Sequence, residues 1–136
     1  MTRIVVVEDY AAWRDYACSK LEQEPQFQIV AAISDGLEAV QRAQELQPDL
    51  IILDIGLSNL NGIEAARRFL QLVPQTKVLF LSEHSSLDIV QEALKTGANG
   101  YVLKSSAGSE LLAAAKVVLE GQMFISKVLV NHFLLT

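Results

Sequence analysis

Five short apolar runs recur along the chain at a spacing that strongly limits how it can fold. Their starts lie about 20–28 residues apart, and the runs are Ile4–Val7, Phe27–Ile33, Leu50–Leu53, Val78–Leu81 and Tyr101–Leu103. The first, third and fourth are continuously apolar rather than alternating, which is typical of parallel strands that helices cover on both faces. The spacing fits a strand followed by a helix, repeated along the chain.

The segments between these runs carry apolar residues at the helical repeat. Their expected buried faces are Trp13, Ala17 and Leu21; Ala39, Val40, Ala43 and Leu46; Ile63, Ala66, Phe69, Leu70 and Val73; Ile89, Val90, Ala93 and Leu94; and Leu111, Leu112, Ala115, Val118 and Leu119. Prolines or glycines follow each segment, and Ser85 with Asp88 predicts a capping box before the fourth helix. Right-handed crossovers then predict an α/β fold, a flavodoxin-like (βα)5 doubly wound sandwich whose five-stranded parallel sheet has the order 2-1-3-4-5.

Length and charge narrow the class of protein further. The chain has 136 residues, which suits one compact domain, and a net charge of −5 without a Lys/Arg cluster. We therefore expect no direct binding of nucleic acid and no membrane association. The single cysteine, Cys18, fits a small helix residue in a reducing, cytoplasmic setting. The apolar tail at 125–136 either packs on the domain or begins a linker to another one.

Polar and charged residues stand where four of the predicted strands end. Glu8 and Asp9 follow the first strand, Asp54 the third, Ser82 the fourth and Lys104 the fifth. Because the carboxyl ends of parallel strands meet at one edge of the sheet, we expect these side chains to share one crevice.

This set of side chains suggests phosphoryl chemistry. Three acids in one crevice repel each other unless a cation lies among them, and oxygen ligands suit Mg²⁺. Lys104 could hold a phosphoryl oxygen and Ser82 could donate a hydrogen bond to another, which leaves Asp54 to act as the nucleophile. Each residue alone has an ordinary explanation as a cap, a turn or a solvated side chain. The set, from four separate segments, carries the hypothesis.

These residues belong to motifs that resemble the receiver domain of bacterial two-component response regulators. The motifs are VVVED (5–9), LIILDIGLSNLNGIEAARR (50–68), VLFLSEH (78–84) and GANGYVLKSS (97–106), and the similarity runs from about residue 3 to residue 124. The chain looks most similar to receivers that precede a LuxR-type helix-turn-helix output domain. Residues 1–124 would then be the receiver domain, with the output domain outside this chain.

The resemblance implies a role for each matching position. Asp54 would accept a phosphoryl group from a histidine kinase or phosphotransfer protein, while Lys104 and Ser82 contact that group. Mg²⁺ would be bound by Glu8, Asp9, Asp54 and the backbone carbonyl of Gly56. Ser82 and Tyr101 would form the switch, and the signal would leave through the surface made by the fourth helix, fifth strand and fifth helix. Such a chain would not be an enzyme beyond its own phosphorylation and dephosphorylation, and homodimerisation is possible.

Several positions depart from the family pattern. Glu8 replaces the commoner Asp, Ser58 stands where Pro is frequent, and Glu83 adds an acid beside the crevice. Ser105 follows Lys104 where many relatives have a proline after a cis bond, and we expect a cis Lys104–Ser105 bond so that the lysine is aimed inward. His84 is a surface residue by default, but the family pattern places it beside the phosphoryl group.

Other functions fit the sequence less well. A phosphatase of the haloacid-dehalogenase type needs a second acid where this chain has Gly56. A flavin- or nucleotide-binding module needs a Gly- or Ser-rich loop where this chain has the acids of VEDYAAWRD. Two further alternatives lie closer to the receiver family. They are a stand-alone single-domain receiver and a phosphorylation-independent interaction module.

Overall fold

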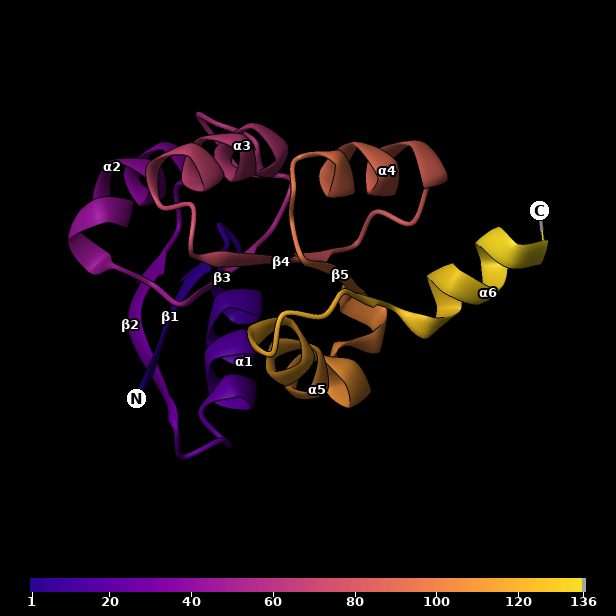
Figure 1. Cartoon of the computed structure of the whole chain (residues 1–136), viewed down its shortest axis with the longest axis horizontal. Helices are drawn as coiled ribbons and strands as arrows, with labels where there is room; N and C mark the ends of the chain where they lie inside the picture. The colour runs from indigo at the N-terminus through magenta and orange to yellow at the C-terminus, as the bar shows by residue number, and fades with distance from the viewer. Residues whose placement is uncertain (136) are drawn as a thin grey trace.

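Strands and helices alternate from one end of the chain to the other (Figure 1). The computed structural model describes residues 1–135, without the side chains of 134 and 135. The strands are β1 (Thr2–Val7), β2 (Phe27–Ile33), β3 (Leu50–Leu53), β4 (Lys77–Ser82), β5 (Gly100–Leu103) and β6 (Phe124–Ile125). The helices are α1 (Ala11–Leu21), α2 (Gly36–Leu46), α3 (Gly62–Leu72), α4 (Leu87–Lys95), α5 (Ala107–Leu119) and α6 (Lys127–Leu135), with a 3₁₀ turn, η1 (Lys104–Ser106), before α5.

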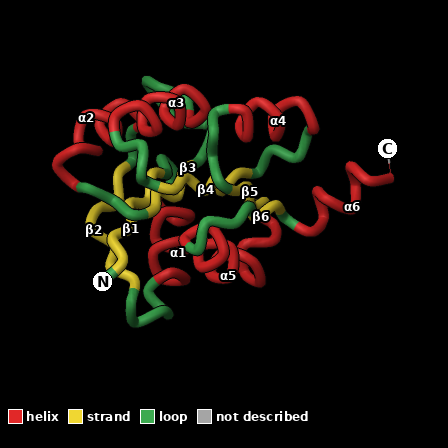
Figure 2. The backbone as a smooth tube through the Cα atoms, in the orientation of Figure 1, coloured by secondary structure: helices red, strands yellow, loops and turns green. Residues whose placement is uncertain are grey.

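The sheet is parallel throughout and has the order β2-β1-β3-β4-β5-β6 (Figure 2). Its first five strands follow the predicted order, but the prediction of five strands is wrong. The additional strand comes from the tail, where Phe124 and Ile125 pair with Gly100 and Tyr101 of β5. The physical reason is that β5 would otherwise be an edge strand, whose backbone N–H and C=O groups are available to any extended apolar segment nearby.

Helices cover the sheet on both faces (Figure 1). Helices α2, α3 and α4 lie on one face, and α1 and α5 lie on the other. All four residues of β3 are buried, and so are the last four of β1 and the last five of β4. Burial from both sides explains why these three runs are continuously apolar, as the sequence predicted.

The helix boundaries follow the local signals closely, with one difference. Gly97 and Gly121 adopt positive φ angles of 99° and 90° just after α4 and α5, which is the left-handed conformation that glycine favours at helix ends. The predicted capping box at Ser85 is wrong by one residue. Ser86 is the N-cap of α4, and its hydroxyl accepts a hydrogen bond from the backbone N–H of Ile89 at 3.4 Å.

The tail packs on the domain over its first part. Leu129 of α6 is buried in the same apolar cluster as the inner faces of α2, α3 and α4, whereas Val128 and Val130 are exposed. Helix α6 extends away from the sheet toward the C-terminus (Figure 1), although Phe133 still packs against that cluster. None of the helices in the described part of the chain has the length and apolar character needed to cross a membrane.

Candidate functional site

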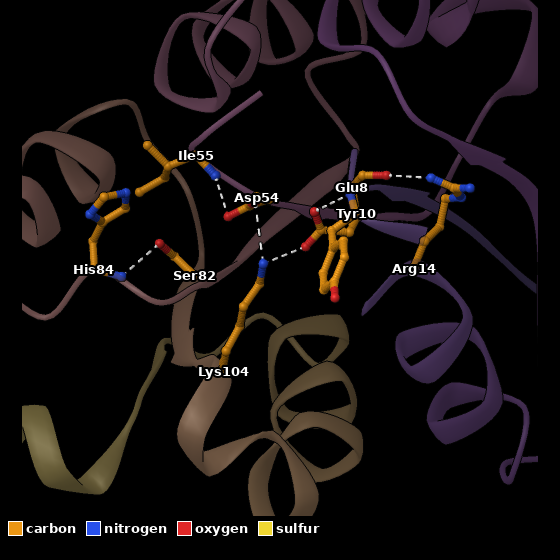
Figure 3. A network of polar contacts seen from close by, with 8 residues as sticks. All are labelled: Glu8, Tyr10, Arg14, Asp54, Ile55, Ser82, His84 and Lys104. Carbon is orange, nitrogen blue, oxygen red and sulfur yellow. Dashed lines mark hydrogen bonds and ion pairs between the residues drawn. The ribbon is translucent and has the colours of Figure 1, made fainter. Parts of the chain in front are cut away.

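The strand ends meet in one crevice at the carboxyl edge of the sheet. Figure 3 shows Glu8, Asp54 and Lys104 pointing toward one another from the ends of β1, β3 and β5. The crevice has a volume of about 240 Å³. Its lining residues are Glu8, Asp9, Tyr10, Trp13, Asp54, Gly56, Glu83, His84 and Lys104. Ser82, which was predicted beside it, is completely buried at the end of β4.

Lys104 binds two carboxylates at once. Its Nζ lies 2.5 Å from Oε1 of Glu8 and 3.4 Å from Oδ2 of Asp54. The other oxygens are held by backbone amides, since Tyr10 donates its N–H to Oε2 of Glu8 at 3.0 Å and Ile55 donates its N–H to Oδ1 of Asp54 at 2.8 Å (Figure 3). The longer side chain of Glu8, relative to Asp, therefore lets one carboxylate reach both a backbone amide and Lys104.

Burial and charge act in opposite directions on these groups. Burial raises the pKa of Glu8, the contacts with Lys104 and the Tyr10 N–H lower it, and the charge of Asp54 raises it, so that the net shift is upward. Burial acts to lower the pKa of Lys104, but its contact with Glu8 and the charge of Asp54 outweigh burial and raise that pKa. The ammonium is therefore firmly protonated at neutral pH.

The acids have the arrangement that a cation site requires. Glu8, Asp9 and Asp54 each offer a carboxylate oxygen, and these atoms all lie within 4.8 Å of one another. Oε1 of Glu8 is buried and has no hydrogen bond of normal geometry within the described residues, although Lys104 lies against it. Asp9 is exposed at the mouth, and Gly56 borders the same crevice. These residues could hold a metal ion.

The peptide bond between Lys104 and Ser105 is trans, as are all peptide bonds in the described residues. The expected cis bond is wrong. Lys104 opens the η1 turn directly after β5, and its side chain reaches Glu8 and Asp54 from there with only 9% of it exposed. Lys104 reaches the crevice from a trans peptide bond. A cis non-proline bond, which costs about 3–4 kcal/mol, is therefore not required to aim its side chain inward.

The segment after β4 links Ser82 to Tyr101 through His84. The backbone N–H of His84 donates to Oγ of Ser82 at 3.1 Å, and the hydroxyl of Tyr101 donates to the carbonyl of His84 at 2.8 Å. Tyr101 is completely buried, because β6 pairs with β5 on its outer side. Tyr101 is therefore not the half-buried aromatic that an edge strand would carry. Burial raises the pKa of Tyr101, hydrogen bonding with Ser82 opposes this rise, and the charge of Asp54 adds a smaller upward effect.

The loop after Asp54 is held by contacts that do not involve a proline. Asn59 adopts a positive φ of 67°, and its side-chain amide donates to Oδ1 of Asp35, the N-cap of α2, at 2.5 Å. Ser58 is exposed, and its carbonyl accepts the N–H of Leu60 at 2.7 Å. A proline at position 58 would restrict the backbone conformations of this loop. Here these hydrogen bonds restrict them instead.

Sequence reasoning missed two residues that border or support the crevice. Trp13 was assigned only to the buried face of α1, but it also lines the crevice, with Nζ of Lys104 5.2 Å from the centroid of its ring. Arg14 donates from Nη1 to the carbonyl of Glu8 at 2.9 Å. Their position one helical turn after Asp9 was the available signal. Glu83, which departs from the family pattern, is exposed, and His84 is half-buried, and both line the crevice.

The comparisons with known proteins agree with this architecture. The sequence profile described as "Response regulator receiver domain" matches residues 4–116. A solved two-component response regulator of the LuxR family from Aurantimonas sp. SI85-9A1 is 31% identical, with a TM-score of 0.91 over 96% of this chain and 94% of that one. The response regulator domain of Thermotoga maritima CheB is 32% identical, with a TM-score of 0.82 over 88% of this chain and 97% of that one.

Several curated relatives are named as transcriptional regulators. The transcriptional regulatory protein DegU of Brevibacillus brevis is 40% identical over 90% of this chain and 52% of its own length, and the transcriptional activator protein ExaE of Pseudomonas putida is 41% identical over 76% and 48%. The chain thus spans about half the length of these relatives. With the family profile covering most of its length, this chain belongs to the response regulator receiver domains.

Proposed function

We propose that Asp54 is the phosphoacceptor of a signalling switch. The observation that carries the proposal is the pairing of a reachable carboxylate, Asp54 at the end of β3, with the ammonium of Lys104 at the end of β5, whose side chain is only 9% exposed. A carboxylate oxygen attacks the phosphorus of a phosphohistidine on a histidine kinase or phosphotransfer protein. The new O–P bond forms as the P–N bond breaks, and the imidazole nitrogen keeps the electron pair. Lys104 offsets the charge on the transferred group.

The cation in this proposal is Mg²⁺, bound by Glu8, Asp9, Asp54 and the carbonyl of Gly56. The support is the chemistry of the donors, which are all oxygens, together with the buried Glu8 oxygen that lacks a well-formed hydrogen bond. When bound, the ion supplies positive charge against the phosphoryl oxygens. Lys104 already neutralises part of the acidic cluster and keeps the acids close together before any ion arrives.

Ser82 and Tyr101 are the switch residues in this proposal. Both are buried, and both contact the backbone of His84, which borders the crevice. A phosphoryl group that draws the Ser82 hydroxyl toward Asp54 changes the hydrogen bond to His84, and Tyr101 responds through the carbonyl of the same residue. The change then reaches the surface of α4, β5 and α5.

The wider role follows from the relatives, several of which are named as transcriptional regulators. We propose that residues 1–124 form the receiver and that 125–136 lead toward a DNA-binding output domain, with phosphorylation favouring a homodimer in the cytoplasm. The receiver itself does not contact nucleic acid, and it turns over no small substrate. A stand-alone receiver is the alternative for the same phosphoacceptor.

Intact-mass measurement after incubation with acetyl phosphate and Mg²⁺ tests the proposal. The wild-type chain is expected to gain about 80 Da, the mass of one phosphoryl group, and Asp54→Asn is expected to gain nothing. A wild-type chain without the added mass, or an Asp54→Asn chain that still acquires it, would show that Asp54 is not the phosphoacceptor. The same samples incubated with a generic phosphomonoester should release no phosphate beyond the uncatalysed rate.

A further inference from the structure

Lys104 has an aromatic neighbour in addition to its two carboxylates. Its Nζ lies over the indole of Trp13, 5.2 Å from the ring centroid, which is within the range of a cation–π interaction. The three neighbours come from separate parts of the fold, since Glu8 follows β1, Asp54 follows β3 and Trp13 lies in the first turn of α1. With only 9% of its side chain exposed, Lys104 is poorly solvated, which strengthens each of these contacts.

Trp13 is itself held in place. Its ring meets that of Tyr16 edge to face, with centroids 5.3 Å apart and an interplanar angle of 83°. The same ring packs against the apolar cluster that α1 and α5 form with the sheet. An indole fixed on two sides offers Lys104 a rigid surface, because the ring cannot turn away without losing both contacts.

The three partners of Lys104 differ in what happens to them during phosphorylation. Glu8 and Asp54 are the groups that the proposed cation and phosphoryl group engage, so their charge is shared with those groups when the site is loaded. The Trp13 ring carries no charge, and its contact with Lys104 does not depend on those groups.

We propose that Trp13 is a positioning residue that holds the Lys104 ammonium over the crevice by a cation–π interaction, so that it meets the phosphoryl group as Glu8 and Asp54 are engaged. The inference rests on the phosphoacceptor function proposed above. It assigns to Trp13 an electrostatic role, which differs from the role of a large apolar side chain that merely fills space between α1 and α5.

Fluorinated tryptophan separates these two roles. Trp13 is the only tryptophan in the sequence, so biosynthetic incorporation of 5-fluoro-, 5,7-difluoro- and tetrafluorotryptophan changes this position alone. Fluorine withdraws electron density from the ring face and weakens cation–π attraction, while the shape of the indole changes little. The rate of phosphorylation by acetyl phosphate with Mg²⁺ is expected to fall stepwise along the series, by about two- to fivefold in total. The urea midpoint of unfolding, measured on the same samples, reports how far fluorine changes the packing of the ring.

The Lys104→Met chain supplies the matched control. Without the ammonium there is no cation–π contact for fluorine to weaken, so the residual rate should be the same across the fluorinated series. A fall in rate that persists in Lys104→Met would come from other contacts of the ring, such as the edge-to-face contact with Tyr16. Rates that are equal across the series in the wild-type background, or that fall equally in Lys104→Met, would overturn the positioning role. If the wild-type chain takes up no phosphoryl group, the phosphoacceptor proposal fails first, and this inference fails with it.

Discussion

Lys104 is the residue whose surroundings decide the electrostatics of the crevice. Its ammonium neutralises part of an acidic cluster in which Glu8 is almost completely buried and Asp54 is 8% exposed. Two buried like charges are costly without a partner of opposite sign, so Lys104 stabilises the cluster in the absence of a cation. Any cation that enters must compete with that ammonium for Oε1 of Glu8.

Replacing Lys104 with Met should therefore tighten Mg²⁺ binding. We expect the Kd to fall by at least about fivefold, equivalent to about 1 kcal/mol, because the competing cation is lost while all the acids remain. Isothermal titration calorimetry measures the change, and Lys95→Met provides the control, since Lys95 is exposed at the end of α4. An unchanged or weaker affinity in Lys104→Met would mean that the ammonium does not compete for the site.

The reactivity of the Cys18 thiol gives a second prediction at the scale of a single residue. It is half-buried, and burial together with the nearby charges of Glu22 and Asp15 raises the pKa of its thiol, against a smaller opposing effect of Arg14. Because the thiolate is the reactive form, less of it is present at pH 8 in the folded chain than in the unfolded chain. Alkylation by iodoacetamide should be several-fold slower in the native protein than in urea.

The difference between the native and the unfolded alkylation rates should depend on pH. As the pH rises past the raised pKa of the folded state, the thiolate fractions of the two states converge, and the difference in rate should shrink. A native rate at pH 8 that equals or exceeds the rate in urea would contradict the raised pKa.

The entry into α3 is the element on which the geometry of Asp54 depends most directly. Gly62 opens this helix, and a Cβ at that position would lie 1.9 Å from the backbone carbonyl oxygen of Asp54. The atoms that this Cβ would meet belong to the backbone, which cannot move aside as the end of a flexible side chain can. A substitution of Gly62 therefore has to displace either the helix or the end of the strand. The close approach of Gly62 to the backbone of Asp54 therefore constrains where Asp54 lies.

Gly62→Ala should destabilise the chain by about 2 kcal/mol or more, through this overpacking. Gly56→Ala is the control in the same loop, because no atom lies within 4 Å of its added Cβ, and its effect should stay within about 0.5 kcal/mol. Urea denaturation of both variants measures the difference. Equal stability of the two variants would show that the approach of Gly62 to Asp54 does not constrain the fold.

Strand β6 and the start of α6 form a second informative element, because they fasten the tail to β5. Ser126 is completely buried, and its hydroxyl donates to Oε1 of Glu110 in α5 at 2.5 Å while accepting the N–H of Leu103 at 2.9 Å. Its own N–H donates to the carbonyl of Tyr101 at 2.9 Å. The tail is thus bonded to Leu103, which precedes Lys104, and to Tyr101, whose hydroxyl donates to the carbonyl of His84.

Ser126→Ala should lower the free energy of unfolding by about 1–3 kcal/mol, since it leaves the buried N–H of Leu103 without a partner. Amide exchange at Leu103 should accelerate as well, which nuclear magnetic resonance can follow at that single residue. Ser109→Ala is the matched control, because its hydroxyl makes one exposed contact, with the carbonyl of Ser106 at 3.3 Å. Protection of Leu103 that survives in Ser126→Ala would argue against this anchoring.

At the scale of the whole molecule, a cation should act on stability as well as on chemistry. Mg²⁺ that binds the folded chain and not the unfolded one stabilises the fold by mass action, by about 1.4 kcal/mol at ten times its Kd. The urea midpoint should therefore rise with Mg²⁺ but not with NaCl at equal ionic strength. Asp9→Asn should reduce the gain, and a rise that NaCl reproduces would indicate general screening of the −5 net charge instead.

Local patterns in the sequence predict much of this molecule. The apolar run Leu50–Leu53 is continuous because helices cover β3 on both faces, and its ending at Asp54 places that carboxylate at the carboxyl edge of the sheet. The same reasoning places Glu8 and Lys104, since parallel strands joined by right-handed crossovers must end at one edge. Gly97 and Gly121 mark helix ends through backbone freedom that other residues lack.

Tertiary contacts decide what these patterns leave open. Whether the tail pairs with β5, whether Lys104 needs a cis bond to reach Glu8, and whether Trp13 faces the core or the crevice all depend on residues far apart in sequence. The periodicity of apolar residues shows which face of a helix or strand is apolar. It does not predict which side chain of another element will contact that face. Local sequence patterns were enough to predict the β-α alternation and the strand ends at which the charged residues meet. Packing in three dimensions decided the sixth strand, the reach of Lys104 into the crevice from a trans peptide and the aromatic contact of Lys104, because each results from long-range contacts rather than from a local repeat.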